Sequence, residues 1–233
     1  MNNIEPIDNC ERTCKLILRL SLSDVKTNPN NLGYSYVTKH VDIVRKLTLG
    51  EISICKKLFR DTINYERVRI LAAVHKIEEN KPSPGVIAEK GVLYFPPKPE
   101  NPTNSHYFQN DFSNPDGNIR IKRLATLLFI HEMTHIWQRS IADFNLQPPR
   151  PITPAEIGRD AYYIPWEHEA PRHFSTYNNE QQAELVAGYY DITIFTNENH
   201  SIRRVQYLLE VIKPFLDNPA DKRLLPVNAT DRR

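Results

Sequence analysis

The alternation of apolar and polar positions predicts strands in the first part of the chain and helices in the second. Strand-like segments, rich in β-branched and aromatic residues or alternating with a period of two, occupy residues 15–22, 65–74 and 91–97. A helix is predicted over 48–63, because Thr48 and Glu51 stand in the spacing of a capping box. The strand at 91–97 ends in two prolines, which protect an exposed sheet edge, so we expect it to be an edge strand that pairs with substrate backbone.

Apolar residues at helical spacing predict three further helices, over 118–144, 178–195 and 201–216. The first has Asp116 or Asn118 as its expected N-cap, and the second has Asn178. We expect the apolar face of the first to be buried; it includes Leu124, Leu127, Leu128 and Phe129. The polar residues 217–233 are expected to be loosely held. Strands followed by helices favour an α+β fold with a small mixed or antiparallel sheet over a doubly wound parallel sheet.

Composition and charge narrow the class of protein. The chain has 233 residues, 40% of them hydrophobic and 25% charged, which is typical of a globular domain that buries a substantial core. A net charge of +2 is too balanced to indicate nucleic acid or an anionic membrane as the main partner. The start of the chain lacks the pattern of a signal peptide, so we expect synthesis as a cytoplasmic protein. Three cysteines, Cys10, Cys14 and Cys55, argue against a disulfide framework and are interpreted as small buried or half-buried thiols.

The stretch LLFIHEMTHIWQ (127–138) places three ionisable residues inside an apolar helix. His131 and His135 are one turn apart and project from the same face, so their imidazoles can bind one zinc ion together. Glu132 then lies beside the metal, where it can accept a proton from a water that zinc activates. This is the H-E-x-x-H arrangement of metallopeptidases. An unliganded trio of these residues would be costly in so apolar a segment, and the alternative to a metal site is a hydrogen-bonded pair of core histidines.

A catalytic zinc needs a third protein ligand and an open fourth position. The metzincin extension is excluded, because Gln138 and Ile141 stand where that class has glycine and histidine. Glu180 and Glu184, one turn apart on the next predicted helix, match the gluzincin arrangement. In that arrangement Glu180 binds the metal, and Glu184 supports a ligand histidine through its far ring nitrogen. Ala183, Ala187 and Gly188 would let this helix pack closely on the first.

Other polar residues between the two helices keep alternatives open. Asp160, His168 and His173 are rival third ligands. Amide hydrolysis also needs a group that stabilises the developing oxyanion. The residue types in 158–177 that can do so include Tyr162, Tyr163, His168 and His173, and the sequence does not choose among them.

The segments LLFIHEMTHIWQ, YNNEQQAELV, LTLGE and LYFPP together resemble the zinc metallopeptidase domains associated with the spike (Vgr-related) proteins of bacterial type VI secretion. The resemblance spans residues 47–195, which implies one domain over 1–233 with an N-terminal extension (1–46), a catalytic core (47–195) and a C-terminal helix and tail (196–233). It implies a zincin-like fold, one zinc per chain on His131, His135 and Glu180, and Glu132 as the base. Glu184 departs from the aspartate of well-known gluzincins by one methylene.

The resemblance further implies a toxic effector that passes from the cytoplasm of the producing bacterium, by type VI secretion, into the periplasm of a target cell. Its implied partners are a protein or peptide substrate, a spike protein and a cognate immunity protein. Two other functions compete with a peptide hydrolase. One is a secretion-associated adaptor whose structural zinc is closed by a fourth ligand such as His168 or His173. The other is a hydrolase of the peptide or amide bonds of peptidoglycan.

Overall fold

A computed structural model of the chain describes residues 43–72, 86–89, 91–96, 107–142, 162–166, 168–195 and 200–226. The predicted strand at 15–22, the thiols of Cys10 and Cys14, and the rival ligand Asp160 lie outside the described residues.

The described residues form a mixed α+β fold, which confirms the predicted class. The four strands are β1 (Val44–Lys46), β2 (Arg69–Ala72), β3 (Ile87–Glu89) and β4 (Val92–Phe95). The helices of eight or more residues are α2 (Leu49–Phe59), α3 (Ile119–Ile141), α5 (Asn179–Ile194) and α6 (Ile202–Asp217). Short 3-10 helices cover Tyr65–Arg67, Phe174–Thr176 and Lys222–Leu224.

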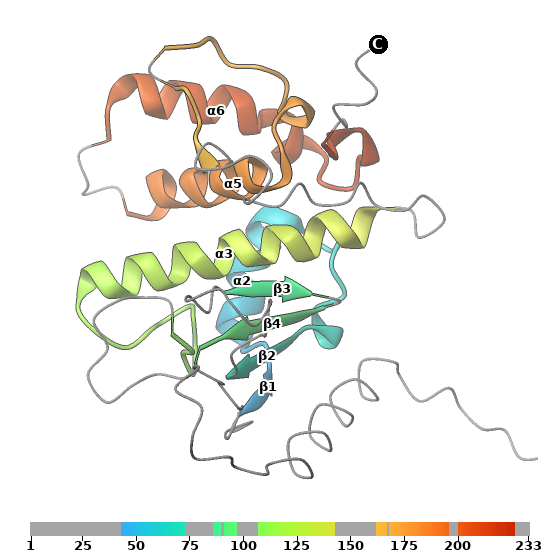
Figure 1. The fold of residues 1–233 in the computed structure, drawn as a ribbon, viewed down its shortest axis with the longest axis vertical. Coiled ribbons are helices and arrows are strands. Elements are labelled where there is room, and N and C mark those ends of the chain that lie inside the picture. Colours follow the sequence, from blue (N-terminus) through green and yellow to red (C-terminus); the bar gives the residue numbers. More distant parts are fainter. Residues whose placement is uncertain are drawn as a thin grey trace, which may run out of the picture.

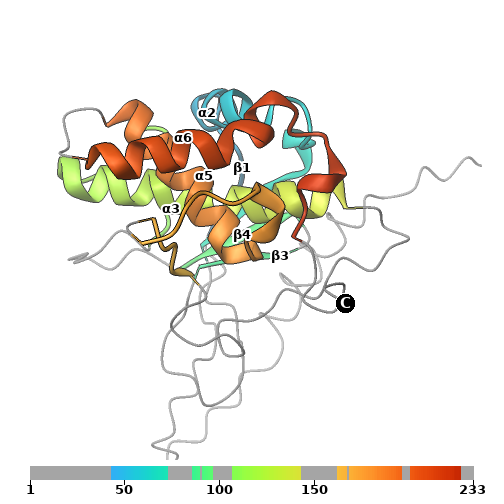
Figure 2. The same cartoon turned by 90° about the horizontal axis from the view of Figure 1, so that it is seen from above.

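Helix α3 occupies the middle of the molecule, with the sheet on one side and α5 and α6 on the other (Figure 1). The strand nearest to α3 is β3, and α5 separates α3 from α6 in the same view. Seen from above, α6 lies in front of α5 and α3 (Figure 2). Helix α3 therefore lies between the two halves of the fold, and residues on its α5-facing side can meet residues of α5.

The sheet order is β1-β2-β4-β3, with β2 and β4 parallel and both outer pairs antiparallel. The prediction that residues 91–97 form an edge strand is therefore wrong, because β4 pairs with a strand on each side. The four residues of β4 are all buried, which explains their apolar character without an exposed edge. The edge that faces α3 is β3 (Figure 1).

The predicted N-caps set where the helices begin. Thr48 and Glu51 form the capping box of α2, and Asn118 rather than Asp116 caps α3. Glu51 is fully buried and does more than cap its helix. Its carboxylate accepts two hydrogen bonds from Arg45, both at 2.7 Å, and one from the backbone of Phe112 at 2.8 Å. One carboxylate thus joins β1, α2 and the loop that leads into α3.

Aromatic side chains fill the core on both sides of α3. On the sheet side, Phe112 lies between Phe95 and Phe129, with ring centroids 4.3 and 5.2 Å apart. On the other side, the ring of Trp137 meets that of Phe215 edge-on at 4.9 Å, and its indole N–H donates to the carbonyl of Pro219 at 2.7 Å. Cys55 is a buried thiol, as expected, and burial raises its pKa well above the ordinary value.

Two expectations about burial hold only in part. Phe129 is fully buried and Leu127 and Leu128 pack partly buried against the core, but Leu124 is 44% exposed, because this part of the α3 surface also borders a cavity. The segment after α6 is held in place at Pro219 and Leu224, which are buried and whose carbonyls accept hydrogen bonds from Trp137 and Gln182. None of the described helices is both long and apolar enough to cross a membrane.

We expect Glu51→Gln to lower the free energy of unfolding by about 3 kcal/mol, because it leaves the Arg45 guanidinium without its buried counter-charge. Urea denaturation of the purified chain at neutral pH measures the change. Lys213→Gln serves as the control: it breaks an ion pair with Asp217 whose side chains are 69% and 62% exposed, and should cost less than about 1 kcal/mol. Equal effects of the two substitutions would contradict the linking role of Glu51.

Candidate metal centre

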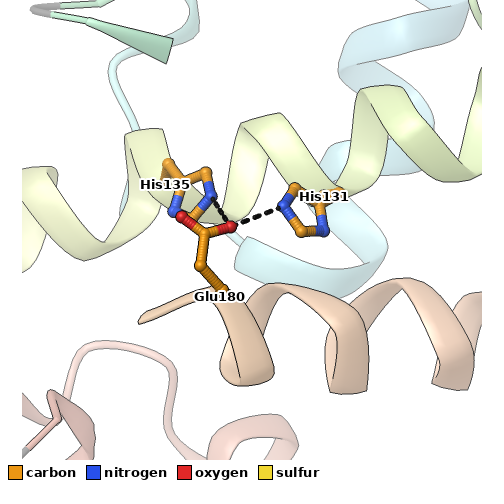
Figure 3. Close-up of side chains that lie close together, drawn as sticks. All are labelled: His131, His135 and Glu180. Carbon is orange, nitrogen blue, oxygen red and sulfur yellow. Dashed lines mark hydrogen bonds and ion pairs between the residues drawn. The ribbon is translucent and has the colours of Figure 1, made fainter. Parts of the chain in front are cut away.

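His131 and His135 project from the middle of α3 toward the first turn of α5 (Figure 3). Their ring centroids are 5.0 Å apart and the rings are nearly perpendicular. His131 is buried and His135 is partly buried, so both imidazoles are largely removed from water. The one-turn spacing in the sequence is what brings both rings to the same face.

Glu180 reaches this face from the start of α5. Asn178 caps the helix in a capping box with Gln181, which fixes Glu180 in the first turn. Its Oε2 atom lies 3.2 Å from Nε2 of His131 and 3.3 Å from Nε2 of His135 (Figure 3). Glu180 therefore aims one carboxylate oxygen at the point where the two imidazoles converge.

The three donors fit a divalent metal of the zinc type. Their candidate ligand atoms all lie within 4.8 Å of one another, and within the described residues this is the group of histidine, cysteine or carboxylate side chains so arranged. Zinc with bonds of 2.0–2.2 Å in tetrahedral geometry separates neighbouring ligand atoms by about 3.4 Å. The two measured separations from Glu180 are close to that value. Two imidazoles and one carboxylate are also a donor set that catalytic zinc sites use.

Each histidine is held through its other ring nitrogen. Nδ1 of His131 lies 3.1 Å from Oε1 of Glu184, and Nδ1 of His135 lies 2.9 Å from Oε1 of Gln138. Contacts of this kind fix the tautomer and ring orientation of a metal-binding histidine. Sequence reasoning singled out Glu184 but missed Gln138. The available signal was a polar residue three positions after His135, on the same side of an otherwise apolar helical segment.

Gln138 connects the centre to the C-terminal part of the fold. Its amide nitrogen donates to Oε1 of Gln182 at 3.0 Å. Gln182 is fully buried and in turn donates to the carbonyls of Phe174, at 3.0 Å, and Leu224, at 2.8 Å. The ring of His135 is thus positioned by a chain of amide hydrogen bonds that ends beyond α6.

The ionisable groups of the centre shift one another's pKa. Burial alone lowers the pKa of His131, but hydrogen bonds with Glu180 and Glu184 outweigh it and raise that pKa to about 10. Burial acts to raise the pKa of Glu180, and the two histidines bring it well below its ordinary range. Burial raises the pKa of Glu132. Without a metal, the carboxylates thus hold a positive charge on the imidazole, at a place where a divalent cation could replace it.

Of the candidates for oxyanion stabilisation, Tyr162 lies nearest to the histidines. Its ring centroid is 6.2 Å from that of His131, and burial followed by the carboxylates of the centre raises its pKa. Tyr163 lies beside it, with its side chain 53% exposed and its backbone carbonyl accepting a hydrogen bond from Gln181. His173 instead caps the 3-10 helix at Phe174–Thr176. Within the described residues, neither His168 nor His173 belongs to the group of converging donors.

A cavity of about 490 Å³ opens beside the centre. His131, Glu132 and Tyr162 contribute to its wall, so the cavity reaches one of the three converging donors and the glutamate beside it. Its volume is within the usual range of ligand-binding pockets. The remaining wall comes from α3, α5 and α6 and from Val86, which precedes β3.

We expect the wild-type protein to bind about one zinc per chain, and folded Glu180→Ala to bind much less, because two imidazoles alone form a weak site. Elemental analysis after dialysis measures the metal, and circular dichroism checks folding. Glu210→Ala, an exposed change on α6, is the control and should keep its zinc. A folded Glu180→Ala protein with full zinc content would move the third ligand elsewhere.

Gln138→Leu should weaken zinc binding by about 10- to 100-fold while leaving all three ligands in place, because the ring of His135 loses its hydrogen-bond acceptor. Competition with a zinc chelator of known affinity measures the change. Gln206→Leu, an exposed glutamine on α6, is the matched control and should leave the affinity unaltered. Unchanged affinity in Gln138→Leu would show that this amide does not position His135.

The sequence matches no protein-family model and no curated protein. Among solved structures, the chain is similar to the effector domain of VgrG2b from Pseudomonas aeruginosa, at 24% sequence identity, with 75% of this chain and 84% of that chain covered and a TM-score of 0.47.

Proposed function

We propose that this chain is a zinc-dependent metallopeptidase, with His131, His135 and Glu180 holding the metal and Glu132 acting as general base and acid. One arrangement carries the proposal: three donor atoms converge at the spacing of tetrahedral zinc ligands, and one of the three residues, His131, lines a cavity together with Glu132. A buried acid beside such a group, in a cavity large enough for several residues of peptide, is what hydrolysis of an amide requires.

Zinc bound there would supply a Lewis acid that polarises the substrate carbonyl and makes water nucleophilic at neutral pH. Glu132 follows His131 in the chain, so its carboxylate is one position round the helix from the metal-facing side. It would take a proton from the attacking water and pass that proton to the amide nitrogen as the C–N bond breaks. The carboxylate is regenerated, and no covalent link to the chain is formed.

Tyr162 is the residue we assign to the developing oxyanion. Its half-exposed side chain lines the cavity beside His131, from which a phenolic hydroxyl can donate a hydrogen bond to substrate. The segment that carries it is tied to both C-terminal helices, because Gln181 of α5 donates to the carbonyl of Tyr163 and Arg203 of α6 to that of Trp166.

A catalytic site is favoured over a structural one by its number of protein ligands. A structural zinc is closed by four protein donors, whereas within the described residues three converge here. The rival adaptor function needs a fourth ligand such as His168 or His173, and His173 is engaged with Ser175 at 2.9 Å.

We further propose that the enzyme is an effector of type VI secretion, made in the bacterial cytoplasm and acting in the periplasm of a target cell. This part of the proposal rests on the resemblance of the two metal motifs and their flanking segments to the peptidase domains of spike-associated proteins. A spike protein and an immunity protein are the partners that such a role requires.

We expect Glu132→Gln to retain one zinc per chain and lose about 10²- to 10⁴-fold in peptide hydrolysis, because the amide cannot accept the proton. The assay follows release of new amino termini from a denatured protein mixture, with purified cell-wall sacculi as a parallel substrate. Glu210→Gln is the surface control. Full activity in zinc-loaded Glu132→Gln would exclude the assigned base, and activity on sacculi alone would move the substrate to peptidoglycan.

A further inference from the structure

Three leucines extend the metal-binding face of α3 into the cavity. Leu124, Leu127 and Leu128 precede His131 by seven, four and three residues, so all lie on the same side of the helix as that ligand. They line the cavity together with Val86. This apolar stripe continues from the converging donors toward the start of α3, and a side chain of the substrate can be buried on it.

A cation lies in the same cavity. Arg204, in the first turn of α6, lines it together with Gly188 of α5, and also lines a neighbouring pocket that contains Tyr162 and Glu184. Its Nη2 atom is 3.9 Å from the position that a Cβ atom would occupy at Gly188. The guanidinium therefore lies next to α5 at this position.

The guanidinium of Arg204 makes no hydrogen bond or ion pair within the described residues, where only its backbone N–H is engaged, by Ser201 at 3.2 Å. The acids nearby are already bound. Asp191 accepts from Arg123 at 2.6 and 2.7 Å, and Glu184 contacts His131. A half-buried guanidinium without a counter-charge is therefore available to an anionic ligand.

The position of Arg204 is also unfavourable for its own helix. The first turn of α6 contains no acidic residue, although acids there would complement the partial positive charge of the helix N-terminus. A cation in this turn instead adds to that positive charge. The guanidinium of Arg204 and the N-terminus of its helix are thus two positive groups close together, and they favour a carboxylate ligand over a neutral one.

We propose that Arg204 is a specificity-determining residue that binds a carboxylate of the peptide substrate, while the leucine stripe holds an apolar side chain between that carboxylate and the cleaved bond. This inference rests on the proposed peptidase function and names its substrate class. The carboxylate can be the C-terminus of the peptide or the side chain of an aspartate or glutamate, because both present the same two oxygens to a guanidinium.

The spacing along α5 limits how far the carboxylate lies from the cleaved bond. Glu184, which contacts His131, and Gly188, which is next to Arg204, are one helical turn apart, about 6 Å along the axis. An extended peptide advances about 3.3 Å per residue, so the bound carboxylate lies within a few residues of the metal centre.

Binding to the zinc-loaded Glu132→Gln protein tests the proposal without turnover. The probes are three hexapeptide pools of mixed neutral residues, each labelled with an uncharged BODIPY dye: one with an amidated C-terminus, one with a free C-terminal carboxylate, and one amidated with a glutamate at varied positions. Fluorescence anisotropy gives the affinities. We expect one carboxylate pool to bind about tenfold or more tightly than the neutral pool. The pool that gains identifies the source of the carboxylate.

Arg204→Gln, added to the same protein, should reduce that preference to about twofold or less, because the amide has no charge to pair with the carboxylate. Lys213→Gln, which removes one positive charge from the exposed side of the same helix, should retain it. Arg204→Lys keeps the charge but loses the forked geometry, and should restore part of the preference. Circular dichroism confirms the fold of each variant.

Equal binding of all pools, or a carboxylate preference that survives in folded Arg204→Gln, would overturn the role of Arg204. The two proposals fail separately when the wild-type enzyme is given the same pools. Arg204-dependent carboxylate binding without cleavage would remove the peptidase function and leave the anion site. Cleavage without carboxylate preference would leave the peptidase and remove the anion site.

Discussion

The packing of α5 against α3 places four ionisable side chains, His131, Glu132, His135 and Glu180, in a space that is largely closed to water. Charges in such a place are costly unless each is paired or bound to a metal. The structure meets this constraint by opposing two imidazoles with one carboxylate and by giving each imidazole a second partner. Close approach of the helices depends on small residues such as Ala183, which is fully buried in α5.

The support of the centre extends well beyond the two helices that form it. Gln138 positions His135, Gln182 positions Gln138, and the carbonyl of Leu224 fixes Gln182. Trp137, the neighbour of Gln138, also contacts the segment after α6, because its indole N–H donates to the carbonyl of Pro219. The residues after α6 are therefore part of the scaffold of the site, although their polar sequence is typical of a loose tail. A buried amide chain of this kind is favourable only when every member is satisfied, which makes the orientation of His135 specific.

The cavity combines features that serve different steps of one reaction. In the proposed enzyme, the metal centre with Glu132 would provide the chemistry, whereas the leucine stripe of α3 and Arg204 of α6 would provide recognition. Helix α6 lies on α5, which carries Glu180 (Figure 1). It also places Arg204 at the cavity. Gly188 of α5 lies beside both Leu208 of α6 and the guanidinium of Arg204. The small residue that the sequence suggested for contact with α3 thus serves contact with α6.

The sequence by itself determined the local structure and the chemical type of the centre. Capping residues and apolar periodicity locate α2, α3, α5 and α6 to within a few residues, because caps and amphipathic faces are short-range properties of the chain. The spacing of His131 and His135 places both rings on one helical face for the same reason. Tertiary structure alone decided that Glu180, which lies 45 residues after His135 in the chain, meets the two histidines. It also made Gln138 a partner of His135 and placed β4 inside the sheet. The tertiary structure likewise places three leucines of α3 at a cavity that Arg204 also lines. Helical periodicity shows which residues share a face, but it does not show which element or cavity that face meets.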